Sequence, residues 1–303
     1  MPYSNFSGLT LVTPPSSDPV TIADVRAHSR IYSTAHDSLI ASYISTATMA
    51  CETTTKRAFL TQTWRLALEQ WPGRSPVVGY REATSMAEYW KWNYIALPLP
   101  PLQSITSFTY ADTTGLVYNM NQLSVPGQMG QTTVGNYLLD LETEPGRVRL
   151  PFAGIWPVTI LLPGSPILIT YVCGWPSYSG AITVDQSGAA TQTAGDPFVP
   201  QLRGTWINVG GVSLNVIAYI DSTHLLLSAS VGPDGAPVTP PGGGSAAYTA
   251  NTVPQPIRTA ILYLAAHLYE NREPIVVGRS QTAIEIPSTI DAMLEPYKIR
   301  RTG

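Results

Sequence analysis

The chain has 303 residues, of which 44% are hydrophobic and only 12% are charged, and its formal net charge is -3. A chain of this length can bury the core of one or two domains. The near-neutral charge, without a basic stripe, argues against recognition of a nucleic-acid sequence. The low share of charged residues favours assembly with other proteins. A β-rich protein with many Ser and Thr residues would have a similar composition.

The N-terminal part is predicted to contain an extended arm and two helices. Residues 1–20 are rich in Pro, Ser and Thr and contain neither the basic nor the apolar segment of a signal peptide. Thr21 and Asp24 match a capping box, which indicates that a short helix begins there and runs to about Ile31. The apolar residues of 37–57 recur every three or four positions, which predicts a second helix.

From Phe59 onward the spacing of apolar residues changes to two, which is typical of half-buried strands. Strands are predicted over 63–70, 95–98, 105–111, 116–123, 137–141, 147–150 and 167–172. Two turn signals, Asp112–Gly115 and Glu144–Gly146, each lie between two of these strands and predict β-hairpins. Prolines throughout 150–184 exclude a membrane-spanning helix in that uncharged run.

Residues 177–253 differ from the rest of the chain in composition. They are rich in Gly, Ala, Ser and Thr, and they hold four acidic residues and one basic residue, which accounts for the whole net charge. The strands predicted in this segment are 181–184, 205–209, 213–219 and 224–228. Pro240–Ser245 (PPGGGS) is predicted to be a flexible link. We interpret the segment as a small β-domain inserted into the main one.

The last part of the chain is predicted to form a strong helix followed by an arm. Pro254 and Pro256 suit the first turn of a helix, and its apolar stripe is expected to pack against the helix at 37–57. Pro274 ends this helix. Residues 274–303 are predicted to form a C-terminal arm with a short helix at 288–294. Both terminal arms are expected to become ordered only against neighbouring proteins.

The sequence contains no phosphate-binding, dinucleotide-binding, serine-hydrolase or zinc-protease motif. A stripe on the last helix could hold a metal with a further ligand, but hydrogen bonds and ion pairs at a helix end are the more frequent role of such residues. Its members are His267, Glu270 and Glu273. Three alternating carboxylates could perform acid–base catalysis, but a solvated strand edge is the more frequent role. These are Asp140, Glu142 and Glu144.

Five tryptophans could stack on bases or sugars, although packing in a core or an interface is the more frequent role. They are Trp64, Trp71, Trp90, Trp92 and Trp156. Cys51 and Cys173 are too few for a disulfide framework, and we expect buried thiols in a reducing compartment. We therefore predict no catalytic, cofactor-binding or metal-binding residue and no enzymatic activity.

Three stretches together resemble the head–tail connector (adaptor) family of tailed bacteriophages, related to the HK97 connector protein. They are 64–72 (WRLALEQWP), 97–115 (LPLPPLQSITSFTYADTTG) and 257–273 (IRTAILYLAAHLYENRE). The resemblance covers roughly 21–175 and 254–273, whereas compact members of the family have only a short loop in place of 177–253. It implies an α+β fold in which a small helical bundle, formed by two N-terminal helices and a C-terminal helix, joins a β-rich element. The expected domains are an arm (1–20), a connector core (21–176 and 254–273), the inserted β-domain (177–253) and a second arm (274–303).

The resemblance also implies a function without catalysis or cofactors. Family members are structural virion proteins of the neck, where a homo-oligomeric ring, expected to have twelve copies, joins the portal protein to a tail-side stopper or tail terminator protein. Double-stranded DNA passes through the ring without sequence recognition, and no membrane is involved. The expected locations are the host cytoplasm during assembly and then the virion. The alternatives are a carbohydrate-binding or hydrolytic tail or accessory protein, and a stand-alone β-rich enzyme.

Overall fold

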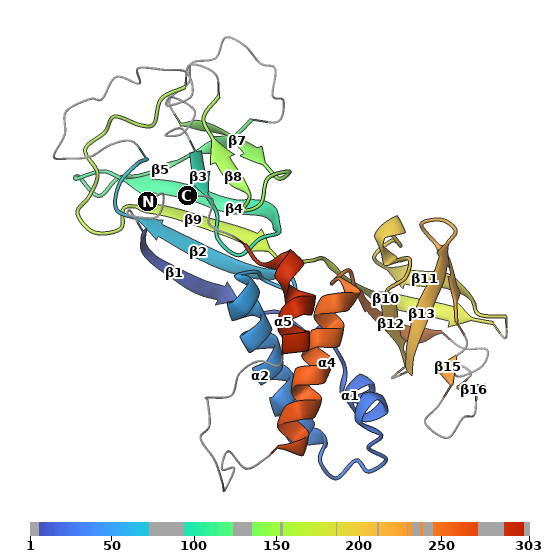
Figure 1. The fold of residues 1–303 in the computed structure, drawn as a ribbon. Helices are drawn as coiled ribbons and strands as arrows, with labels where there is room; N and C mark the ends of the chain where they lie inside the picture. Colours follow the sequence, from blue (N-terminus) through green and yellow to red (C-terminus); the bar gives the residue numbers. More distant parts are fainter. Residues whose placement is uncertain are drawn as a thin grey trace, which may run out of the picture. The chain divides into compact units, whose positions relative to one another are not determined.

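The computed structural model describes residues 6–72, 94–123, 135–151, 154–185, 187–210, 212–228, 230–231, 237–238, 245–271 and 288–299 (Figure 1). The chain has a mixed α+β fold, as predicted. It divides into two compact units. The first comprises 1–15, 56–174 and 299–303, and the second comprises 16–55 and 175–298. The described helices thus belong to the same unit as residues 177–253.

The first unit contains two β-sheets. The larger has the order β1-β2-β9-β4-β5, with every neighbouring pair antiparallel. Its strands are β1 (Phe6–Thr13), β2 (Gln62–Leu68), β9 (Ile167–Cys173), β4 (Leu102–Ala111) and β5 (Val117–Asn119). The smaller sheet has the order β3-β8-β7-β6. Its strands are β3 (Tyr94–Ala96), β8 (Arg147–Arg149), β7 (Asn136–Asp140) and β6 (Asn121–Gln122).

Both hairpins predicted in this unit are confirmed. Strands β4 and β5 pair across the Asp112–Gly115 turn, and β7 and β8 pair across Glu144–Gly146. Within the N-terminal arm, Phe6–Thr13 is extended, as expected, and it is also paired, because β1 forms a ladder with β2 at the edge of the larger sheet.

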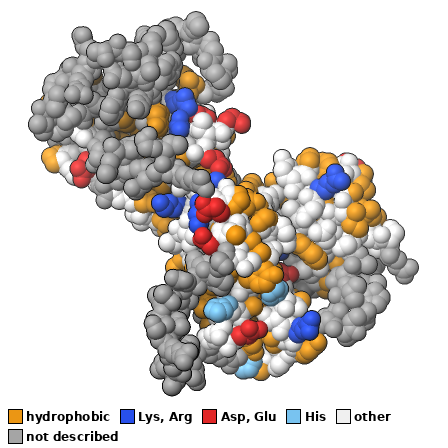
Figure 2. All heavy atoms as spheres, viewed as in Figure 1, with side chains coloured by type: hydrophobic (Ala, Val, Ile, Leu, Met, Phe, Trp, Pro, Cys, Tyr) orange, Lys and Arg blue, Asp and Glu red, His pale blue; other side chains and the backbone are white. Residues whose placement is uncertain are grey.

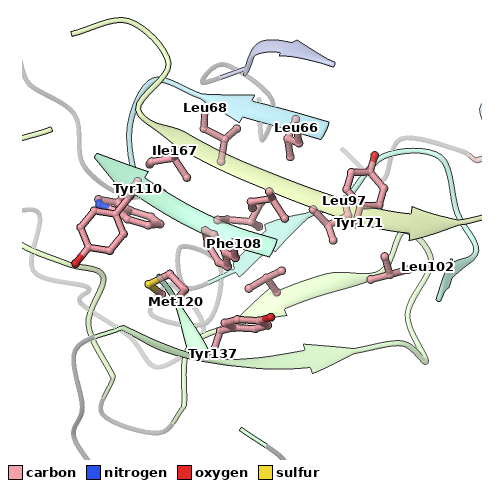
Figure 3. Close-up of a cluster of buried hydrophobic side chains, with 14 of the residues drawn as sticks. Leu66, Leu68, Leu97, Leu102, Phe108, Tyr110, Met120, Tyr137, Ile167 and Tyr171 are labelled. Carbon is pink, nitrogen blue, oxygen red and sulfur yellow. The ribbon is translucent and has the colours of Figure 1, made fainter. Parts of the chain in front are cut away.

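The core of the first unit lies between the two sheets. Leu66, Ile169 and Phe108 are direct cross-strand partners on β2, β9 and β4, and all three side chains are buried. Directly paired residues of an antiparallel ladder lie on the same face of the sheet. Figure 3 shows these strands contributing Leu66 and Phe108 to the cluster, with Tyr137 of the smaller sheet below Phe108. The alternation read from the sequence therefore produces one continuous apolar face.

The second unit contains all four α-helices of the described residues. They are α1 (Ile22–Ser29), α2 (Asp37–Thr55), α4 (Gln255–Glu270) and α5 (Ser288–Leu294). The capping box at the start of α1 is confirmed: the Asp24 N–H donates to Thr21 Oγ1 (3.1 Å) and the Thr21 N–H donates to Asp24 Oδ2 (2.8 Å). The predicted packing of α4 against α2 is also confirmed, and α1 and α5 pack against α4 as well.

The inserted segment folds as a closed six-stranded barrel within the second unit, in the order β10-β11-β14-β13-β12-β17. Its strands are β10 (Ser177–Val184), β11 (Ala189–Gly195), β14 (His224–Leu227), β13 (Val212–Tyr219), β12 (Trp206–Val209) and β17 (Ala246–Asn251). A 3-10 turn, Pro200–Leu202, and a two-stranded ribbon, β15 (Ser230–Val231) with β16 (Pro237–Val238), complete it. The barrel encloses its own buried cluster, which includes Ile182, Leu214 and Leu225. Residues 240–244 of the expected link lie outside the described residues.

Candidate assembly surfaces

The predicted acidic cluster does not form a catalytic pair. Asp140 Oδ2 lies 2.6 Å from Arg149 Nη2, and Glu144 forms an ion pair with Arg57. Glu142 is exposed on the loop after β7. The Asp140–Arg149 pair links the two strands of the β7–β8 hairpin, and Glu144 joins the hairpin turn to Arg57, so Asp140 and Glu144 act as structural groups.

In the part of the chain that the structure describes, the stripe considered as a possible metal site is not brought together with further ligands. His267 Nδ1 lies 3.1 Å from Asn271 Nδ2 at the end of α4, and Glu270 is exposed. Glu273 lies outside the described residues. Within the part of the chain that the structure describes, no group of three His, Cys, Asp or Glu side chains is placed to hold a metal ion.

Three of the five tryptophans considered above belong to the core of the first unit. Trp71 and Trp156 are both buried and stack with their ring centroids 5.0 Å apart and their planes 9° apart. Trp64 packs against the same cluster. These three rings are therefore not exposed stacking platforms for a sugar or a base. Trp90 and Trp92 lie outside the described residues.

Both cysteines are buried, as predicted from their apolar surroundings, and they are not joined in a disulfide. Burial raises the pKa of the Cys51 thiol to about 12, and the neighbouring Glu52 carboxylate adds to this rise. A thiol with such a high pKa stays protonated at neutral pH and is a poor nucleophile.

A buried arginine joins the barrel to the helices inside the second unit. Arg258 of α4 is only 5% exposed, and its Nη1 donates to the carbonyl oxygen of Trp206 on β12 (3.2 Å). Its Nη2 lies 3.7 Å from Oδ2 of Asp24, the residue that caps α1. Burial lowers the pKa of Arg258, and the Asp24 carboxylate opposes this shift. Asn251 of β17 adds a hydrogen bond from its side chain to the Pro19 carbonyl (3.3 Å).

Arg258 lines a cavity of about 400 Å³ between the barrel and the helices. The segment before α1, residues of α2 and the strands β10, β12 and β17 form the rest of its wall. Arg258 was not predicted from the sequence as a functional residue. The signal that could have revealed it is a charged residue on the same helical stripe as Ile261 and Ala265, at spacings of three and seven.

Two exposed apolar surfaces lie at the two edges of the larger sheet in the first unit. The first, which we call the β1 stripe, consists of Leu9 and Leu11, whose side chains are 37% and 42% exposed. Leu9 is the cross-strand partner of Leu66, and Leu11 that of Trp64. The β1 stripe therefore continues the apolar rows of the core onto the edge strand, where solvent reaches them.

The second surface, which we call the turn patch, surrounds the β4–β5 turn. It consists of Leu116 (56% exposed), Val117 (60%), Ile160 (76%) and Leu162 (40%). Main-chain hydrogen bonds hold the two segments together: the Thr113 N–H donates to the Ile160 carbonyl (3.2 Å) and the Leu162 N–H donates to the Ala111 carbonyl (3.1 Å).

A buried carboxylate shapes the turn patch. Asp112 Oδ1 accepts hydrogen bonds from the N–H groups of Thr114 (2.8 Å) and Leu116 (3.1 Å), and Oδ2 accepts one from the Tyr118 hydroxyl (3.0 Å). Hydrogen bonding, first from the Thr114 side chain, lowers the pKa of Asp112. An Asp that bonds to the backbone two residues further on is a turn-forming element, and here it presents Leu116 and Val117 to solvent.

On the described part of the face in Figure 2, charged side chains are few, and most of the visible atoms belong to hydrophobic side chains, other uncharged side chains or the backbone. No helix in the described part of the chain is both long enough and apolar enough to span a membrane. The arrangement offers surfaces for protein contacts and, among the described residues, no reactive cluster.

No protein-family model matches the chain, and no curated protein is similar to it in sequence. Among solved structures, it is similar to a chain in the "Neck of empty GTA particle computed with C6 symmetry", with a TM-score of 0.51, 15% identity and coverage of 98% of this chain and 97% of that chain. It is also similar to a chain in the "Virion of native gene transfer agent (GTA) particle", with a TM-score of 0.51, 16% identity and coverage of 97% of each chain. At these identities, the similarity establishes a shared fold.

Proposed function

We propose that this protein is a structural component of the neck of a phage-like particle, where it forms the adaptor ring between the portal protein and the tail. The observation that carries the proposal is the shared fold with a chain from the neck of a gene transfer agent, which extends over 98% of this chain, the barrel included. A match that covers both units and the insert at once favours a common role more strongly than a match to one domain. The ring is expected to contain twelve copies, as in the HK97-type connector family.

The surface composition supports a ring that lines a DNA channel. A conduit has to let double-stranded DNA pass, and many cationic contacts to phosphates would bind the DNA and slow its ejection. The chain has a net charge of -3, and its only lysines are Lys56, Lys91 and Lys298. This balance suits passage without sequence recognition and without a strong hold on the phosphate backbone.

The arms and the barrel are assigned different contacts in this proposal. Residues 274–303 are proposed to reach the portal protein, and the described part of them holds α5 and the short turn Glu295–Tyr297. A stopper or tail terminator protein is the proposed tail-side partner. The barrel of 177–253 is proposed to lie on the outer side of the ring and to be dispensable for the joint, because it encloses its own core.

The test is to locate the chain in the particle and to remove it. A tagged chain should appear as a ring of density between the head and the tail in particles purified from the producing cells. Loss of the chain should leave DNA-filled heads without tails. A tag that labels the tail tip or fibres, or normal particles without the chain, would refute the adaptor role.

Trp71 and Trp156 stack in the core of the first unit, whereas Trp206 of the barrel is 37% exposed, so the carbohydrate-binding alternative would place its site on the barrel. Titration with oligosaccharides, followed by tryptophan fluorescence, should leave the spectrum unchanged.

A further inference from the structure

We infer that the β1 stripe of one copy of this chain packs against the turn patch of the next copy. Each copy then contributes one edge of its larger sheet to the contact on one side and the other edge to the contact on the other side. This inference rests on the proposed ring and assigns the surfaces that would close it. It follows from the exposure, the position and the charge of the two surfaces.

Exposure identifies the β1 stripe as a surface that is incomplete in the single chain. Leu66 and Ile169 are 0% exposed, yet Leu9, which extends the same cross-strand row onto β1, is 37% exposed. In the next row, Tyr171 is 0% exposed, Trp64 of β2 is partly buried, and Leu11 of β1 is 42% exposed. The apolar face of the sheet therefore continues onto β1, whereas the buried core ends at β2.

The edge strand also lacks the usual protection against pairing with another chain. Edge strands of monomeric proteins commonly carry charged residues or prolines, or are covered by another element. The eight residues of β1 (FSGLTLVT) include no charged residue and no proline. A strand of this kind on the surface favours a stable partner.

Position explains why the partner is a second copy. The two surfaces lie at opposite edges of a five-stranded sheet, and with about 4.8 Å between neighbouring strands they are separated by roughly 19 Å. They therefore cannot cover each other within one chain. A ring of identical subunits is built from heterologous contacts, in which one surface of each copy meets a different surface of the next.

Charge makes the two surfaces compatible. No Asp, Glu, Lys or Arg occurs in 6–13, in 113–119 or in 154–166, which supply the β1 stripe and the turn patch. Contact between them would bury apolar side chains without removing a charged group from water, and the cores of protein interfaces are depleted of charged residues in the same way.

The experiment blocks the β1 stripe and the turn patch separately in the full-length chain. Leu11→Asp places a carboxylate in the β1 stripe, and Leu116→Asp places one in the turn patch. Thr10→Asp is the matched control, because Thr10 is an exposed residue of the same strand whose side chain lies on the opposite, polar face, beside Arg65. Circular dichroism establishes that all three variants fold. Assembly is measured by native mass spectrometry if the wild-type chain forms rings in solution. It is measured by co-purification with particles if the wild-type chain assembles only there.

We expect the control to assemble like the wild type and each blocking variant alone to stay monomeric. An equal mixture of the two blocking variants should form dimers with twice the mass of the 32.7 kDa chain and nothing larger. In each dimer, the intact turn patch of the Leu11→Asp chain meets the intact β1 stripe of the Leu116→Asp chain, and both remaining surfaces are blocked. A chain with Leu11→Cys and Leu116→Cys should give a ladder of cross-linked species with a short bis-maleimide, whereas either single variant should give none.

The outcomes separate this inference from the proposed function. If the wild type assembles and the blocking variants assemble equally well, the two surfaces are not the ring interface, and the adaptor role stands. The same conclusion follows if the mixture of blocking variants and the double-cysteine chain yield only monomers. If the wild type assembles neither in solution nor in particles, both the ring and its interface are refuted.

Discussion

Arg258 offers a direct test of how the barrel is held to the helices. Arg258→Met keeps most of the aliphatic stem and removes the guanidinium, so the change isolates the polar contacts from the packing of the side chain. The variant loses a hydrogen bond from a charged donor to the Trp206 carbonyl (3.2 Å), which is worth about 1.5–3 kcal/mol. The Asp24 carboxylate keeps its bond from the Thr21 N–H, so it is not left without a partner.

The removal of a buried charge offsets part of this loss. Arg258 is 5% exposed, and the depression of its pKa by burial shows that the guanidinium is held at a desolvation cost. We therefore expect a net loss of about 1–3 kcal/mol, below the 3–5 kcal/mol typical of breaking a fully buried pair. In a unit of this size, this corresponds to a decrease of roughly 2–12 °C in Tm.

The assay is thermal unfolding followed by circular dichroism, with hydrogen exchange of β12 and α1 as a local measurement. Arg203→Met is the control, because Arg203 is an exposed arginine of the same barrel. Combining Arg258→Met with Asp24→Asn measures the coupling between the two side chains. A Tm for Arg258→Met that is equal to that of Arg203→Met, with unchanged exchange in β12, would contradict the role assigned to Arg258.

Four further predictions concern the stability of the protein and the reactivity of a thiol. Trp71→Ala should cost about 3–5 kcal/mol and remove the near-ultraviolet circular dichroism of the stacked pair with Trp156; an unchanged spectrum would contradict the stack. Leu264→Ala should cost about 2–5 kcal/mol, because Leu264 is buried on α4, and calorimetry would detect it. The pKa of Asp112 is held below its ordinary 3.8, so its contribution to stability is complete above that pH and is lost as the pH falls through the lower folded-state pKa. Asp112→Asn should therefore be less stable than the wild type at neutral pH and lose less stability below pH 3.8; parallel acid-unfolding curves would contradict this. Cys51 should resist thiol reagents until the chain unfolds, because its pKa is about 12, and labelling of the folded protein would count against its burial.

Local patterns were sufficient to predict most of the elements. The capping box of α1 and the apolar stripe of α4 each depend on residues of a single helix, so they can be read without the rest of the chain. The alternation of 63–70 likewise predicted β2. The hairpin at Asp112 was found because its turn residues lie between two strand patterns.

Non-local pairing explains the elements that were missed. Ala189–Gly195 (AATQTAG) has no large apolar residue, and it becomes β11 because β10 and β14 lie on either side of it in the closed barrel. The leucines of β1 alternate as they would in a buried strand, so their exposure follows only from the sheet order. The partner of Arg258, the Trp206 carbonyl, lies 52 positions away in the sequence and belongs to a different element, which no local pattern reports.

The closure of the barrel has a consequence for how such a chain could gain or lose a domain. Its first and last strands are direct neighbours, with Ser177 opposite Asn251 in the β10–β17 ladder. Opposed residues in an antiparallel pair have Cα atoms about 5 Å apart, so the chain leaves the barrel almost where it entered. A module with adjacent ends and no open edge can be exchanged for a short loop without pulling the flanking elements apart, and it exposes no strand that would pair with a neighbouring copy. Replacing the barrel of this chain with a short loop would therefore leave the two edges of the larger sheet unchanged.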